Sequence, residues 1–176
     1  MEEVGQVLFS EDKIRRRIKT LAAEIDKDYF GREIFCVGVL KGAFVFMSDL
    51  IRFLESPITM DFMSIASYGD TTSSTGVVKL LKDLDTDVES KHVLVVEDIV
   101  DTGLTLNYLL KNLSTRHPAT LKVCTLLDRP ARRKVKVDVH YVGFTIPDVY
   151  VVGYGLDFAQ KYRNLPYIAE LSPVGA

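Results

Sequence analysis

Residues 92–105 read HVLVVEDIVDTGLT, and this stretch decides the fold that we predict for the chain. Its beginning, residues 92–96, is an apolar run typical of a strand buried on both faces. Two adjacent carboxylates, Glu97 and Asp98, follow the run, and a turn at Thr102 and Gly103 then opens a helix. Unpaired N–H groups at a helix start suit a phosphate monoester, and the carboxylates suit sugar hydroxyls or a metal-bound polyol. The stretch therefore predicts a pocket for a phosphorylated sugar.

A plain acidic loop with a helix cap is the alternative interpretation. Asp101 or Thr102 could cap the helix without any ligand, and such caps are common. The three acids Glu97, Asp98 and Asp101 lie within five positions and weigh against this alternative, because uncompensated carboxylates repel one another and need cations nearby. The sequence contains neither GxxxxGK[ST] nor GxGxxG, so a P-loop and a dinucleotide-binding fold have no support.

Strands and helices alternate on both sides of this stretch. Apolar runs predict buried strands at 34–40 and 120–127, and apolar spacing predicts helices after Ser10, after Gly42 and after Gly103. The second of these helices carries the spacing Phe44, Met47, Leu50, Ile51 and Leu54. Further strands are expected at 58–66 and 77–81 as an antiparallel excursion, and at 138–143, 148–153 and 167–171. This order predicts an α/β fold with a parallel sheet, whose ligands lie at the carboxyl ends of the strands, here 40–43, 97–105 and 127–130.

The composition narrows the class of protein. The chain has 176 residues, 22 Lys+Arg against 24 Asp+Glu and 47% hydrophobic residues, which favours one globular domain over residues 1–176. A net charge of −2 removes the main reason to expect nucleic-acid binding. No stretch approaches the ~20 apolar residues of a membrane span, and the acidic start lacks the features of a signal peptide. Cys36 and Cys124 lie in apolar runs, so we expect buried thiols and a cytoplasmic protein.

The string VVEDIVDTGLT at 95–105 resembles the phosphoribosyl-pyrophosphate loop of the type I phosphoribosyltransferases. Further segments, GVLKGA at 38–43 and FTIPDVYVVGYGLD at 144–157, narrow the resemblance to the hypoxanthine(-guanine) phosphoribosyltransferases of purine salvage, over about residues 7–173. The resemblance implies a central, mostly parallel sheet flanked by helices. It also implies a small hood built from N-terminal residues and about 144–176.

The resemblance assigns residues to the sugar donor, 5-phosphoribosyl 1-pyrophosphate. It places Glu97 and Asp98 on the ribose hydroxyls, and Asp101 near the purine as the candidate general base. It implies a cis peptide bond between Leu40 and Lys41 in the pyrophosphate loop. The donor-binding residues that it implies are Lys41, Gly42, Glu97, Asp98, Asp101, Thr102, Gly103, Leu104, Thr105 and Arg163.

The resemblance also implies a purine site, a magnesium site and a mobile loop. The purine residues would be Ile99, Arg129, Tyr150, Val151 and Asp157. Mg²⁺ would be held by Asp157, Glu97 and Asp98, and Ser67 and Tyr68 would begin a loop, continuing through 69–76, that closes over the site. Arg129 departs from the family, which usually has a lysine that donates to the purine 6-oxo group, and arginine is not equivalent at a directional contact. The neighbouring basic residues Arg132, Arg133, Lys134 and Lys136 are expected on a solvated or subunit-facing surface.

Three interpretations of function remain open. The first is transfer of phosphoribose to hypoxanthine or guanine, the second the same reaction with a preference for xanthine. The third is a regulator of the same fold, for which the chain offers neither an added DNA-binding domain nor a basic face. The resemblance implies small-molecule substrates and a homodimer or homotetramer, with no nucleic acid or membrane as partner.

Overall fold

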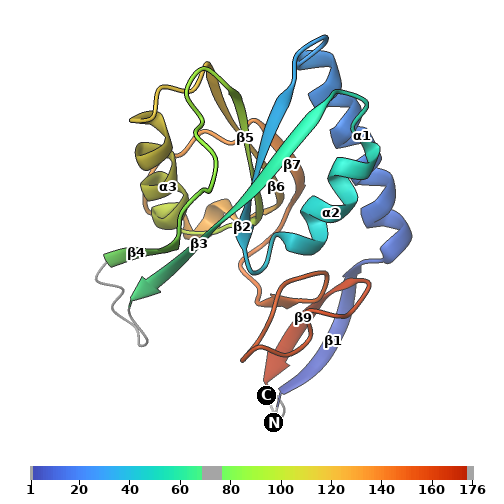
Figure 1. Ribbon diagram of the computed structural model, residues 1–176. Helices are drawn as coiled ribbons and strands as arrows, with labels where there is room; N and C mark the ends of the chain where they lie inside the picture. The colour runs from blue at the N-terminus through green and yellow to red at the C-terminus, as the bar shows by residue number, and fades with distance from the viewer. Residues whose placement is uncertain (1, 69–76, 174–176) are drawn as a thin grey trace.

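The computed structural model describes residues 2–68 and 77–173, which form a large and a small β-sheet with three α-helices (Figure 1). The large sheet contains β2 (Ile34–Leu40), β3 (Ile58–Tyr68), β4 (Val77–Lys82), β5 (His92–Val100), β6 (Thr120–Asp128) and β7 (Tyr141–Thr145). The strand order is β4-β3-β2-β5-β6-β7, and only β4 runs antiparallel to its neighbour. The predicted α/β fold with a mostly parallel central sheet is confirmed, including the antiparallel excursion.

The helices cover both faces of the large sheet. Helices α1 (Glu11–Asp28) and α2 (Phe44–Phe53) lie on one face, and α3 (Leu104–Ser114) lies on the other (Figure 1). Ser10 caps α1 as predicted, because its hydroxyl accepts a hydrogen bond of 3.4 Å from the backbone N–H of Lys13. A short 3-10 helix, η1 (Pro130–Arg132), follows β6.

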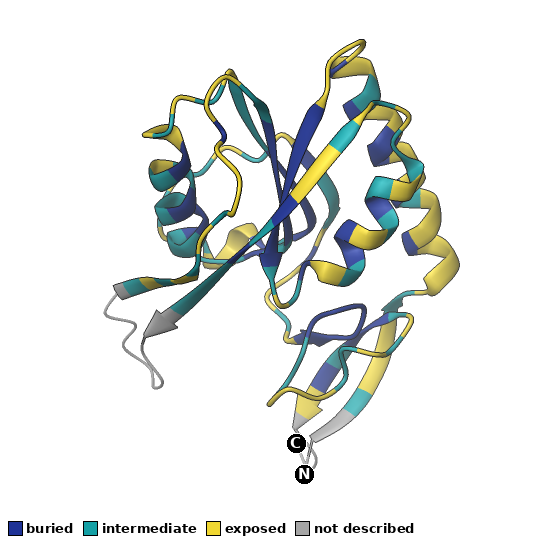
Figure 2. Cartoon of the chain, in the orientation of Figure 1, coloured by how far each residue is buried: buried dark blue, intermediate teal, exposed yellow. Residues whose placement is uncertain are grey.

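Strand β5 sits in the middle of the core. Leu94 and Val96 pack among the residues of α1 and α2, whereas Val93 and Val95 pack among those of α3. All four residues are fully buried, and the central strands of the sheet are coloured as buried in Figure 2. A strand with two apolar faces needs a helix layer on each side, so the apolar run before the acidic motif fixes the motif at the centre of the sheet.

The small sheet joins the two ends of the chain. Its strands are β1 (Glu2–Phe9), β8 (Val151–Val152) and β9 (Ile168–Pro173), in the antiparallel order β1-β9-β8. We call these three strands and the connecting loop 153–167 the hood. The hood lies below the carboxyl ends of the large-sheet strands in Figure 1.

Several sequence expectations need correction. The stretch 138–143 yields a strand only from Tyr141, 148–153 yields the two residues of β8, and β1 was not predicted as a strand. Glu97 and Asp98 lie within β5 rather than in a turn after it. On α2 the buried residues are Phe46, Met47 and Leu50, and Phe44, which lies off this face, is 46% exposed.

Both cysteines are free and fully buried, as predicted. Burial raises the pKa of Cys36 to about 12, so this thiol is inert. None of the helices in the described part of the chain is both long and apolar enough to span a membrane.

Candidate active site

Two adjacent carboxylates, Glu97 and Asp98, lie near the end of the central strand. Glu97 is only 6% exposed, and burial together with the neighbouring Asp98 raises its pKa well above the usual range. Burial likewise raises the pKa of Asp98 to about 6, although its Oδ1 accepts a hydrogen bond of 2.7 Å from the N–H of Ile99. These two carboxyl groups cannot both ionise easily unless a cation or a hydrogen-bond donor lies beside them. Such a pair is typical of a binding site.

The loop after β5 leads directly into α3. Gly103 precedes the helix with φ of 80°, and a Cβ at this position would lie 2.9 Å from the carbonyl oxygen of Val135, so the loop requires glycine here. The Thr102 hydroxyl accepts a 3.3 Å hydrogen bond from the N–H of Leu104. Gly103, at the N-cap, has no side chain to cap the helix, so the other N–H groups of the first turn are available to a ligand.

A cavity of about 400 Å³ lies in front of this loop. It gathers most of the predicted donor-binding residues from three elements of the chain and from the hood. Its lining includes Lys41, Gly42, Glu97, Asp98, Asp101, Thr102, Gly103, Thr105, Asp157 and Arg163. Leu104 does not line it, and its N–H is taken by Thr102.

The cations Lys41 and Arg163 both line this cavity and both contact Gln160. Lys41 Nζ donates to Gln160 Oε1 at 3.3 Å, and Arg163 Nη2 donates to the same oxygen at 3.2 Å. Arg163 also pairs with Asp157 at 2.8 Å. The predicted cis peptide bond between Leu40 and Lys41 is present. Gln160 was not predicted, because nothing in its local sequence shows that the hood folds over Lys41.

Gly42 lies closely against both Asp98 of β5 and Gly155 of the hood. A Cβ on Gly42 would lie 1.6 Å from Asp98 Oδ2. A Cβ on Gly155 of the hood would lie 2.2 Å from the carbonyl oxygen of Gly42. Both contacts require glycine, so these two residues set how closely the hood approaches the carboxylates.

A second cavity of about 280 Å³ adjoins the first. It shares Asp98, Ile99, Asp101 and Asp157 with the first cavity, and Arg129, Arg132, Tyr150, Val151 and Leu156 complete its lining. All five predicted purine residues therefore line one cavity. The Tyr150 side chain is 47% exposed, and its ring lies edge-on to Phe158 at a centroid distance of 5.7 Å. An accessible aromatic ring suits stacking on a planar heterocycle.

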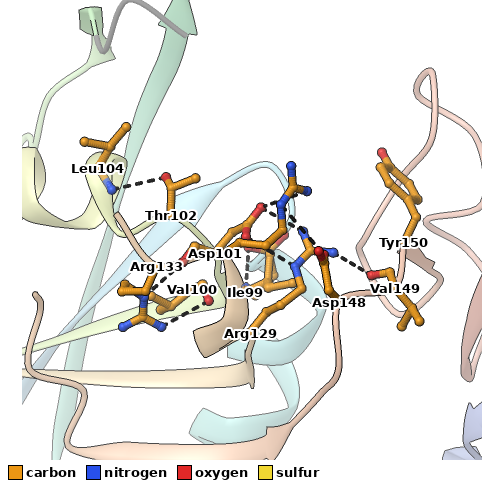
Figure 3. A network of polar contacts seen from close by, with 12 residues as sticks. Ile99, Val100, Asp101, Thr102, Leu104, Arg129, Arg133, Asp148, Val149 and Tyr150 are labelled. Atoms are coloured by element: carbon orange, nitrogen blue, oxygen red, sulfur yellow. Dashed lines mark hydrogen bonds and ion pairs between the residues drawn. The ribbon is translucent and has the colours of Figure 1, made fainter. Parts of the chain in front are cut away.

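Arg129 is buried against Asp101, as Figure 3 shows. Its Nε and Nη2 donate to the two carboxylate oxygens at 3.2 and 2.7 Å, and Nη1 donates to the carbonyl oxygen of Val149 at 2.5 Å. This bidentate geometry is available to arginine and not to the lysine usual in the family. One N–H on each of Nη1 and Nη2 remains for a ligand.

The basic stretch after Arg129 is not only surface, which corrects the expectation for Arg132 and Arg133. Arg132 Nη1 lies 3.6 Å from Asp101 Oδ2 and its side chain lines the second cavity. Arg133 pairs with Asp128 and donates from Nε to the carbonyl oxygen of Asp101 at 2.9 Å. Sequence reasoning missed both because β6 and η1 bring them back onto the loop after β5.

The three acids predicted to hold magnesium do not form a preassembled metal site. Among the described residues no group of three or more histidine, cysteine or acidic side chains is placed to hold a metal ion. Asp157 forms an ion pair with Arg163 and accepts a hydrogen bond of 2.8 Å from the N–H of Gln160. The hard oxygen ligands nevertheless suit Mg²⁺, which commonly binds through one or two carboxylates plus substrate phosphates. The residues therefore fit an ion that arrives with its phosphate ligand.

The predicted mobile loop is described only at its start. Ser67 and Tyr68 end β3, where they pair with Val78 and Val77 of β4. The stretch 69–76 lies outside the described residues.

Comparison with known proteins identifies the family. The family model of the phosphoribosyl transferase domain matches residues 8–159. The chain is 48% identical over 171 residues to the hypoxanthine-guanine phosphoribosyltransferase of Bacillus subtilis, covering 97% of this chain and 95% of that protein. It is 49% identical over 177 residues to the enzyme of the same name from Mycobacterium avium, covering 97% and 87%.

Solved structures agree with the sequence relatives. A crystal structure of a hypoxanthine-guanine phosphoribosyltransferase from Bacillus anthracis superposes with a TM-score of 0.92 at 48% identity, covering 98% of this chain and 100% of that one. A hypoxanthine phosphoribosyltransferase from Staphylococcus aureus gives a TM-score of 0.93 at 47% identity, covering 97% and 92%. The chain belongs to the hypoxanthine-guanine phosphoribosyltransferase family.

Proposed function

We propose that this protein transfers 5-phosphoribose from 5-phosphoribosyl 1-pyrophosphate to a 6-oxopurine, giving a purine nucleotide and pyrophosphate. One observation carries the proposal: the two cavities adjoin at Asp98, Ile99, Asp101 and Asp157. One cavity offers a helix start and carboxylates for a sugar phosphate, and the other offers an accessible ring and a guanidinium for a base. The reacting carbon would lie where they meet.

The donor would bind through its two ends. The backbone donors of Thr102, Gly103 and Thr105 would hold the 5-phosphate. Glu97 and Asp98 would accept hydrogen bonds from the ribose hydroxyls. At the other end Lys41 and Arg163 would exchange the amide oxygen of Gln160, which both contact in this structure, for pyrophosphate oxygens. Two fixed ends hold the sugar for attack, which lowers the entropic part of the barrier.

The transfer breaks the bond between the anomeric carbon and pyrophosphate and forms one to a purine nitrogen. Pyrophosphate leaves with the electron pair of the broken bond, so charge develops on its oxygens next to Lys41 and Arg163. Mg²⁺, held by Asp157 together with the donor's own oxygens, would neutralise part of this charge when bound.

The acceptor must lose a proton as the new bond forms. Asp101 lines both cavities and is oriented through both carboxylate oxygens by Arg129, which makes it the candidate general base. Tyr150 would stack on the base and the backbone of Val151 would contact its edge. The remaining N–H groups of Arg129 would donate to the 6-oxo group. The 6-amino group of an aminopurine could not accept these hydrogen bonds.

The test is pyrophosphate release with the donor, Mg²⁺ and hypoxanthine, guanine, xanthine or adenine in parallel. Turnover with hypoxanthine and guanine but not with adenine is the expected result. A dominant rate with xanthine would keep the reaction and change the acceptor, with Arg129 as the first residue to exchange for lysine. Tight donor binding without turnover on any base would contradict the proposal and favour a regulator of the same fold.

We also propose that the protein forms a homo-oligomer in a reducing, cytoplasmic environment. The two free, buried thiols support such an environment. A solved structure of Trypanosoma cruzi hypoxanthine phosphoribosyl transferase, 43% identical with a TM-score of 0.91, comes from work on the role of that protein's C-terminal region in its oligomeric state and activity. Sedimentation of the purified chain would separate a monomer from a dimer or tetramer.

A further inference from the structure

The carbonyl groups of Val100, Asp101 and Thr102 all accept hydrogen bonds from residues 129–135. Arg133 Nε donates to the carbonyl oxygen of Asp101 at 2.9 Å, and Arg133 Nη2 donates to that of Val100 at 3.4 Å. The backbone N–H groups of Lys134 and Val135 donate to the carbonyl oxygen of Thr102 at 2.9 and 3.3 Å. Figure 3 shows Arg133 reaching beneath the loop toward Val100 and Asp101.

Because peptide groups are planar, the hydrogen bonds to these carbonyl oxygens also fix the direction of the N–H groups of Thr102 and Gly103. The only cis peptide bond among the described residues is between Leu40 and Lys41, so the peptides after Asp101 and Thr102 are trans. In a trans peptide the C=O and the N–H point in opposite directions. Arg133 holds the Asp101 carbonyl, so the N–H of Thr102 points away from Arg133. The N–H of Gly103 is turned in the same way by the bonds to the Thr102 carbonyl.

The side away from Arg133 is the donor cavity. Asp101, Thr102 and Gly103 line that cavity, whereas Arg133 lines neither of the two cavities of the site. Successive N–H groups that converge on one side of a loop form an anion-binding concavity. The orientation of these donors therefore depends on a side chain behind the loop.

The guanidinium of Arg133 is itself fixed. It pairs with Asp128 at the end of β6, and each of the two side chains is only 19% exposed. Its planar fork reaches two successive carbonyl oxygens and a carboxylate at once, a set that the single ammonium of lysine cannot match in direction. Strand β6 pairs in parallel with β5 up to Asp128, so the anchor stands on a rigid neighbour.

We propose that Arg133 is a positioning residue that orients the N–H groups of Thr102 and Gly103 for the 5-phosphate of the donor. This role rests on the proposed phosphoribosyl transfer and adds a residue behind the site to it. Arg133 acts by holding the loop in the required orientation, and not by the attraction of its charge for the phosphate. Replacing it by lysine keeps the charge and removes the fork, so Arg133→Lys separates the two causes.

The experiment is calorimetric titration of Arg133→Lys with ribose 5-phosphate and, separately, with pyrophosphate. We expect the Kd for ribose 5-phosphate to rise about ten-fold, equivalent to about 1.4 kcal/mol, and the Kd for pyrophosphate to change less than about two-fold. In turnover the donor KM should rise more than kcat falls. Lys136→Met, an exposed change on the same segment, is the control and should leave both Kd values unchanged.

A second measurement guards against loss of folding. The N–H signals of Thr102 and Gly103 should shift when ribose 5-phosphate is added to the wild-type protein. They should shift less in Asp128→Asn, which removes the ion pair of Arg133 but keeps its guanidinium. Wild-type affinity in Arg133→Lys, or unchanged shifts in Asp128→Asn, would overturn the positioning role. Absence of ribose 5-phosphate binding by the wild-type protein would instead overturn the proposed function.

Discussion

The core half of the site, residues 97–105, and the hood half, residues 150–163, are held in place by different means. The core half follows a buried strand, and among its described residues only Gly103 has a positive φ. The hood half contains six residues with positive φ, namely Gly153, Tyr154, Gly155, Ala159, Gln160 and Tyr162. Left-handed backbone at non-glycine residues costs energy and persists only where contacts impose it.

Those contacts come from the core. The Tyr154 hydroxyl donates a hydrogen bond to Asp49 of α2, and Gly155 packs on the carbonyl of Gly42. Backbone hydrogen bonds also close the loop: the N–H of Gly155 donates to the carbonyl oxygen of Arg163 at 3.0 Å. The core half is therefore specified by its own sequence, and the hood half by the residues of the core against which it packs. The four predictions below test this division.

The largest effect should come from the core carboxylate at the reacting centre. Asp101→Asn removes the proposed proton acceptor while preserving the side-chain volume, so kcat should fall about 10²–10⁴-fold. The donor KM should change much less, because the donor also binds through 102–105, Lys41 and Arg163. Steady-state rates with hypoxanthine check this. Full turnover with unchanged donor affinity would remove Asp101 from the chemistry.

Gly42→Ala alters the packing of Gly42 between Asp98 of the core half and Gly155 of the hood half. The new methyl group would fall 1.6 Å from Asp98 Oδ2, so the Asp98 carboxylate or the loop must move. We expect the free energy of unfolding to drop by about 1–3 kcal/mol and donor binding to weaken. Chemical denaturation and donor titration measure the two effects. Gly31→Ala is a control for loss of glycine with no atom within 4 Å of the new Cβ, although its positive φ adds some strain. Equal donor affinity in Gly42→Ala and wild type would contradict the close packing.

Tyr154→Phe tests whether the hood depends on its anchor. The change deletes the hydroxyl that donates to Asp49, and a hydrogen bond to a charged group is worth about 1.5–3 kcal/mol. The donor KM should rise several-fold because Arg163 and Asp157 shift with the hood, while kcat falls less. Tyr108→Phe on α3 is the matched control and should behave as wild type. A Tyr154→Phe enzyme with an unchanged KM would show that the hood keeps its place without this bond.

The smallest effect concerns pH and the core half. The pKa of Asp98 is raised to about 6, above the roughly 3.9 of an unfolded chain, so between these values the folded protein binds more protons than the unfolded one. The free energy of unfolding should therefore decrease as pH rises through this window, with Asp98 contributing at most about 1.4 kcal/mol per pH unit. Glu97, also raised, acts in the same direction. Asp98→Asn should flatten this slope and the exposed Asp138→Asn should not; parallel slopes in all three proteins would contradict the burial argument.

The same division explains how much could be predicted from the sequence. The strand, the acidic pair and the Thr-Gly turn follow one another directly in the sequence. The apolar run 92–96 and the motif after it were therefore sufficient to predict the core half. The purine residues from Tyr150 to Asp157 were predicted only through the family resemblance, since alternation around 148–153 indicated a longer strand than the two residues of β8.

Residues that act from a distance in the sequence were missed. Arg133 looked like one of several surface cations, because its acceptors belong to a different strand. Tyr154 and Gln160 gave no local signal, since their partners, Asp49 and Lys41, are more than 100 positions away. Strand β1 was missed because it is ordered by pairing with β9, at the other end of the chain.

A crystal structure of the protein with inosine 5′-monophosphate, the product expected from hypoxanthine, tests the central claim most directly. The phosphate should lie on the N–H groups of Thr102, Gly103 and Thr105, and the ribose hydroxyls on Glu97 and Asp98. The purine should lie against Tyr150 with its 6-oxo group toward Arg129. Each half of the site would then hold its own part of one molecule. A phosphate bound instead between Lys41 and Arg163, with the base outside the cavity that Tyr150 and Val151 line, would contradict the account.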